Sequence, residues 1–144
     1  AAQSADLDCL IDISVNAHIP ESYVESLTLR LDVYRRIADI RNKEDSLDVK
    51  DELKDRFGEI PESVLGLIDI ALIRNCANAM GIYEIRQTDT NVLLFVKEIK
   101  SPKVIELLSR LNGRAMLSAG NKPYITIRCG GGSSLDMLKK VFKI

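Results

Sequence analysis

The sequence is poor in the residues on which metal sites and disulfide frameworks depend. It has one histidine, His18, and three widely spaced cysteines, Cys9, Cys76 and Cys129. An odd number of distant thiols matches neither a disulfide framework nor a metal-ligand pattern, and no histidine–cysteine zinc set is available. We therefore expect reduced thiols and a cytoplasmic location.

Aromatic residues are also scarce, with no tryptophan, three phenylalanines and four tyrosines. This argues against a surface on which nucleic-acid bases stack, because such surfaces depend on exposed aromatic rings. No apolar run approaches the ~20 residues that cross a bilayer, and no signal-peptide pattern opens the chain. We interpret residues 1–8 as a disordered N-terminal segment or a cloning remnant, and residues 9–144 as a single domain.

Charge is unevenly distributed along the 144 residues. Residues 1–96 contain 10 Lys/Arg and 18 Asp/Glu, a balance of -8, and residues 97–144 contain 10 and 3, a balance of +7. One interpretation is the solvated surface of a two-part domain. The alternative is an auxiliary nucleic-acid-binding domain that uses the basic half. Its candidate contacts are Lys97, Lys100, Lys103, Arg110, Arg114, Lys122 and Arg128.

The first half of the sequence predicts one strand and three helices. Apolar and polar residues alternate from Ile11 to Ala17, which is typical of a half-buried strand, and Pro20 ends it. Apolar residues at helical spacing follow. We expect helices over residues 26–40, 47–57 and 61–80, and the first of them is expected to bury Leu27, Leu31, Tyr34 and Ile37.

In the second half, the period of the pattern changes to that of strands. Two β-hairpins are predicted, around residues 89–91 and 119–122, each followed by a helix. Gly130-Gly131-Gly132 is interpreted as a flexible joint, since it lacks the lysine of a P-loop. The expected fold is therefore α+β: an N-terminal strand, a three-helix cluster, then two β-hairpins with interspersed helices in a mostly antiparallel sheet.

The sequence shows no catalytic set. An enzyme needs a nucleophile with a base, paired carboxylates or a metal cradle, and His18 is expected at a strand end on the surface. Cys76 falls on the apolar face of a helix, where cysteine is usually a small core residue. We predict that the domain is not itself an enzyme and holds no cofactor or metal.

One acidic segment is more specific, the run from Glu52 to Glu62 around Phe57-Gly58. Glu52 and Asp55 lie three residues apart and share an outer helix face. They form either a docking strip for an arginine-bearing partner or a solvated face whose carboxylates pair with nearby lysines and Arg56.

Several runs in order along the chain carry a resemblance to a known family. They are Ile19-Pro20-Glu21-Ser22-Tyr23-Val24, Leu29-Arg30-Leu31-Asp32-Val33-Tyr34-Arg35-Arg36-Ile37, Glu52-Leu53-Lys54-Asp55-Arg56-Phe57-Gly58-Glu59-Ile60-Pro61, Ile70-Ala71-Leu72-Ile73-Arg74 and Met80-Gly81-Ile82. Together they resemble the last domain of bacterial transcription-repair coupling factors (Mfd proteins). The resemblance covers about residues 10–86.

The resemblance implies a function in transcription-coupled DNA repair. The family consists of ATP-dependent DNA translocases that remove stalled RNA polymerase and recruit excision repair. Its C-terminal domain docks on an intramolecular UvrB-like module and masks the binding of UvrA, so it is autoinhibitory. Carried over by position, Glu52 and Asp55 would face basic groups on that module, and Arg56 would either join the interface or balance local charge.

The resemblance also sets the expected partners. The parent would bind RNA polymerase, DNA and UvrA, and ATP and Mg²⁺ would be bound only by motor domains absent from this sequence. We expect the isolated domain to be a monomer with no membrane contact.

Overall fold

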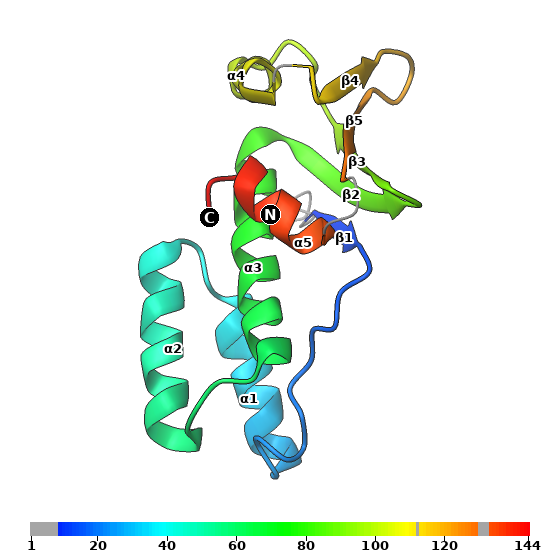
Figure 1. Ribbon diagram of the computed structural model, residues 1–144. Helices are drawn as coiled ribbons and strands as arrows, with labels where there is room; N and C mark the ends of the chain where they lie inside the picture. The colour runs from blue at the N-terminus through cyan, green and yellow to red at the C-terminus, as the bar shows by residue number, and fades with distance from the viewer. Residues whose placement is uncertain (1–8, 112, 130–132) are drawn as a thin grey trace.

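The molecule has a helical part and a sheet part, and helix α3 (Glu62–Met80) runs through both (Figure 1). Below the sheet it packs with α1 (Leu27–Ala38) and α2 (Lys43–Phe57), and its other end lies against the sheet. The computed structural model describes residues 9–111, 113–129 and 133–144. The expectations for residues 1–8 and for the glycine joint at 130–132 lie outside the described residues.

The sheet has five strands in the order β1-β2-β3-β5-β4. β1 pairs in parallel with β2, and the other three pairings are antiparallel. The predicted α+β fold with a mostly antiparallel sheet is thus confirmed. The strands are β1 (Leu10–Asp12), β2 (Ile82–Thr88), β3 (Asn91–Val96), β4 (Ala115–Ser118) and β5 (Tyr124–Arg128), and the remaining helices are α4 (Pro102–Leu111) and α5 (Ser134–Val141).

The N-terminal strand is shorter than predicted, because β1 ends at Asp12. The chain then leaves the sheet and runs along α3, where the backbone N–H of His18 donates to the carbonyl of Ser63 at 3.2 Å. Gly66 of α3 lies at this approach, where a Cβ would make an ordinary contact of 3.4 Å with the Asn16 carbonyl oxygen. The alternation of half-buried and exposed residues persists to Ala17 because one side of the segment faces a helix instead of a sheet.

Two of the predicted helices differ from the structure. α2 begins four residues earlier than expected, because the side chain of Asn42 caps it by accepting from the Asp45 N–H at 2.8 Å. On α1 the core face is formed by Val33 and Ile37, while Leu27 is 62% exposed. Leu31 and Tyr34 are exposed as well, so the predicted stripe was wrong except at Ile37.

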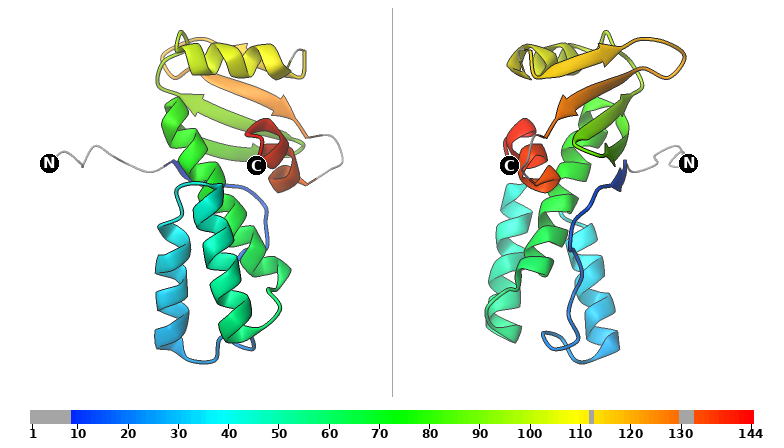
Figure 2. Two further views of the ribbon diagram at one scale, coloured as in Figure 1. Left: turned by 90° about the vertical axis from the view of Figure 1, so that its left-hand side faces the viewer. Right: turned by 45° about the vertical axis from the view of Figure 1, so that its right-hand side comes forward.

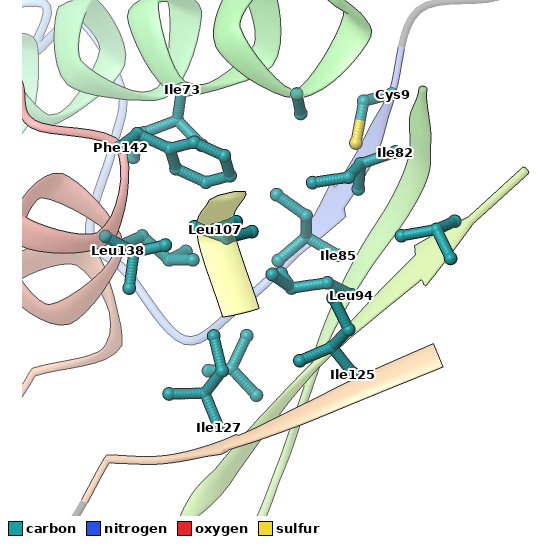
Figure 3. Close-up of a cluster of buried hydrophobic side chains, with 14 of the residues drawn as sticks. Cys9, Ile73, Ile82, Ile85, Leu94, Leu107, Ile125, Ile127, Leu138 and Phe142 are labelled. Carbon is teal, nitrogen blue, oxygen red and sulfur yellow. The ribbon is translucent and has the colours of Figure 1, made fainter. Parts of the chain in front are cut away.

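Two hydrophobic cores meet at α3. One core covers a single face of the sheet with side chains from α3, α4 and α5, among them Ile73, Leu107 and Leu138 (Figure 3). The other joins α1, α2 and the first part of α3. By length and composition α3 is apolar enough to cross a membrane, and its packing in two cores accounts for that composition. Ile144 packs against both cores.

Candidate interdomain docking surface

α2 presents a row of carboxylates to solvent. Glu44, Asp48, Asp51 and Asp55 recur at helical spacing, and each is exposed. Across the described ranges, no lysine, arginine or histidine forms an ion pair with any of the four. We refer to these four residues as the acidic face of α2. A face of one charge sign without internal partners is complementary to a basic surface.

Glu52 differs from the acidic face because it is already paired within the domain. Its carboxylate lies 2.6 Å from the guanidinium of Arg36 on α1 and 3.2 Å from that of Arg56 on α2. Its side chain is 32% exposed. The structure therefore separates the two predicted acidic site residues: Glu52 joins two helices, and Asp55 is exposed without an ion-pair partner among the described residues.

Arg56 is also held locally. Besides its ion pair with Glu52, its guanidinium lies 5.0 Å from the centre of the Phe57 ring, a cation–π geometry. The side chain remains 46% exposed, so it lies beside the acidic face while being oriented by its neighbours.

A cavity of about 350 Å³ lies between α1 and α2, next to this ion-pair network. Its floor is apolar, with Val33, Val49 and Leu53 buried. Its rim is charged, and a partner side chain with an apolar stem and a polar end would fit such a lining. The remaining residues around it are Asp32, Arg35, Arg36, Glu52 and Arg56.

Tyr23 fixes the end of α2. Its hydroxyl lies 2.9 Å from the Gly58 carbonyl and 3.2 Å from the Leu53 carbonyl, and its ring packs 5.7 Å from the ring of Phe57. Burial, with a smaller contribution from Glu59, raises the pKa of the Tyr23 hydroxyl above its usual value. The neutral hydroxyl is thus the form that the fold favours.

The seven basic candidates divide into two groups. Arg110, Arg114 and Arg128 line one cavity of about 690 Å³, together with Lys140 and Lys143. We refer to this as the basic cavity. The other four, Lys97, Lys100, Lys103 and Lys122, do not line it.

Similarity to known proteins identifies the domain that carries these two surfaces. Residues 13–106 match the family model of the TRCF domain. The chain belongs to this family. The recognition of the C-terminal domain of transcription-repair coupling factor, a DNA-repair protein, is therefore confirmed.

The relatives of this TRCF domain are much longer proteins. Over 97% of its length the chain is 28% identical to the transcription-repair-coupling factor of Bacillus subtilis, of which it spans 12%. Over 78% of its length it is 30% identical to the factor of Rickettsia prowazekii, of which it spans 10%. A crystal structure of a C-terminal domain of transcription-repair coupling factor superposes with a TM-score of 0.82 at 16% identity, covering 94% of this chain and 88% of that one, which supports the fold.

The cysteines and the histidine of the TRCF domain are the residues on which a metal site or a nucleophilic centre would depend. Among the residues that the structure describes, no three His, Cys, Asp or Glu side chains are placed to hold a metal ion. Burial raises the pKa of the Cys76 thiol, which disfavours the thiolate needed for nucleophilic chemistry. Cys9 is buried in the sheet core.

Sequence reasoning missed two parts of these surfaces. Arg36 reaches Glu52 only through the packing of α1 on α2, and no local pattern signals that contact. Lys140 lies in the last turn of α5, and Lys143 lies just beyond the end of that helix with a positive φ of 58°. The basic balance of the second half of the sequence was the available signal.

Proposed function

We propose that this TRCF domain is a non-catalytic regulatory module that docks through α2 on the UvrB-like module of its parent protein and masks UvrA binding. The observation that carries the proposal is the acidic face of α2, which is exposed and has no ion-pair partner within the described part of the chain. Membership of the TRCF domain family indicates that the partner should be sought within the parent protein.

Asp55 is the main contact in this proposal. An arginine on the opposing module can pair bidentately with its carboxylate without displacing anything. At Glu52 the same arginine would compete with Arg36 and Arg56. Glu52 therefore acts mainly by holding Arg56 and the α1–α2 cavity in place beside the contact.

Such contacts are releasable. Exposed ion pairs contribute about 0–1 kcal/mol each, so a small set of them gives a docked state that other partners of the parent can displace. A regulatory domain needs this property, because a ligand shifts an equilibrium only by its differential affinity for the two states. On the same grounds we expect ATP, Mg²⁺, DNA and RNA polymerase to be bound by other domains of the parent, in the bacterial cytoplasm.

The masking is tested with the full-length parent. In a pull-down with UvrA, the Asp55→Ala parent should retain more UvrA than the wild-type parent, because undocking exposes the masked surface. Glu106→Ala, which removes an exposed carboxylate of α4, is the matched control and should behave as wild type. Equal UvrA retention by all three proteins would contradict autoinhibition through α2.

A further inference from the structure

We propose that the basic cavity binds the phosphate backbone of nucleic acid. The cavity is lined by residues of α4, β5 and α5 and of the segments next to them. Helices α4 and α5 lie on the same face of the sheet as the end of α3 (Figure 2). Among the described residues, the lining of the cavity includes five cationic side chains and no carboxylate. A concave surface lined by charges of one sign focuses the electrostatic field and attracts the opposite charge.

The fold assembles this cavity from distant parts of the sequence. Arg110 ends α4, Arg114 precedes β4, and Arg128 ends β5, while Lys140 and Lys143 come from the last helix and the residues after it. The guanidinium Nη2 of Arg110 donates to the carbonyl of Val141 at 3.0 Å, which ties α4 to α5. Arg110 therefore also fixes one wall of the cavity.

The five cations are not neutralised by neighbours. In the described ranges no carboxylate lies within ion-pair distance of any of them. The adjacent Lys139 shows the contrast, since it pairs with Asp69 of α3 at 3.2 Å. Five positive side chains around one cavity repel each other, and a bound anion would relieve that repulsion.

The preference of cations for the C-terminal ends of helices explains only some of the five cations in the basic cavity. Cations are favourable in the last turn of a helix because they offset its dipole, and this accounts for Arg110 and Lys140. Arg114, Arg128 and Lys143 lie outside the helices. Their presence in the same lining has no such structural explanation.

The chemistry of the lining favours a ligand with several phosphates. A phosphate group carries about -1.5 to -2 charges at neutral pH, which offsets fewer than half of the five cations. The described residues of the lining include no aromatic side chain, so they offer no surface for base stacking. A phosphodiester backbone fits both facts, and binding should be independent of base sequence.

This inference does not depend on the proposed docking. The acidic face belongs to α2 in the helical part of the molecule, and the basic cavity belongs to the sheet part. Either surface can be disabled while the other is left unchanged.

The test is fluorescence anisotropy of this chain with a labelled duplex of about 20 base pairs and arbitrary sequence. We expect a Kd on the order of 10⁻⁵ M at low salt, with log K falling by about 4 to 5 per log unit of salt if all five cations contact phosphates. Arg114→Gln with Lys140→Gln should make that slope shallower by about 2 and weaken binding roughly tenfold at low salt. Arg110 is left intact because it supports α5.

The matched control is Lys97→Gln with Lys122→Gln, which removes the same charge outside the cavity. It should retain a slope within about one unit of the wild-type slope. The proposal is overturned if the duplex does not bind at low salt, or if the control weakens binding as much as the cavity variant. It is also overturned if ATP, a free polyphosphate, binds the cavity more tightly than the duplex does.

Discussion

The carboxylate of Glu52 and the guanidinium of Arg36 lie 2.6 Å apart and join α2 to α1. This contact gives the two predicted acidic residues different tasks. Glu52 organises the surface from within, and Asp55, one turn further along α2, faces outward without an ion-pair partner in the described part of the chain. A substitution of Glu52 should therefore mainly affect stability, and a substitution of Asp55 should mainly affect docking.

Glu52→Gln should lower the free energy of unfolding by up to about 1 kcal/mol, because it removes partly exposed ion pairs with Arg36 and Arg56. Asp55→Asn should leave stability unchanged. Urea denaturation followed by circular dichroism measures both. A larger loss for Asp55→Asn than for Glu52→Gln would show that the network is wrongly assigned.

Tyr23→Phe should destabilise the domain by about 0.5–1.5 kcal/mol, because it removes the one hydroxyl hydrogen that the Gly58 carbonyl at 2.9 Å and the Leu53 carbonyl at 3.2 Å share. The pKa of Tyr23 is raised in the folded state. Its contribution is therefore fully present below the unfolded tyrosine pKa of about 10 and is lost as pH rises above it toward the folded value.

The stability difference between wild type and Tyr23→Phe should accordingly shrink above a pH of about 10. Tyr34→Phe serves as a comparison, since the hydroxyl of Tyr34 accepts from the Ile19 N–H and makes no hydrogen bond to α2. A wild-type advantage that grows in alkaline solution would show that folding lowers the pKa of Tyr23 instead of raising it.

Two substitutions at Gly66 test how closely the N-terminal segment packs against α3. A Cβ at this position would make ordinary contacts, 3.4 Å to Asn16 O and 3.6 Å to the Ala17 Cβ. Gly66→Ala should therefore be neutral or stabilising by up to about 1 kcal/mol through helix propensity. Gly66→Leu should destabilise by about 1–3 kcal/mol, because its longer side chain must displace residues 13–18. Thermal unfolding distinguishes the two, and equal effects would show that the segment does not pack there.

The two cores should unfold together because α3 contributes to both. Leu107→Ala in the sheet core and Leu53→Ala in the helical core should each cost about 2–5 kcal/mol. Far-ultraviolet circular dichroism and tyrosine fluorescence should report coincident transitions in both variants. A separate early transition of either part would show that α3 does not couple the cores.

Much of the fold followed from local patterns. The hairpin strands and the helix ends at Gly58 and Gly81 were predicted, because period-2 alternation and left-handed glycines are set by nearby residues. The start of α2 was missed because its polar first turn, capped by Asn42, has the composition of a connector. The core face of α1 was missed because helical spacing alone does not decide between two overlapping apolar stripes.

The site was less accessible from the sequence than the fold. Glu52, Asp55 and Arg56 were named through the family resemblance, and their roles as docking residues remain predictions. The pairing of Glu52 with Arg36 is a tertiary contact between helices, and the grouping of Arg110 with Lys140 depends on how α4 and α5 meet at the sheet. Neither has a signature in the spacing of residues.

The most direct test of docking through α2 is calorimetric titration of this domain into the separately expressed UvrB-like module of the same parent. We expect measurable binding that Asp55→Ala weakens by up to about fivefold, which corresponds to about 1 kcal/mol, and that Glu106→Ala leaves unchanged. Binding that is indifferent to Asp55→Ala, or no binding at all between the two proteins, would contradict docking through the acidic face of α2.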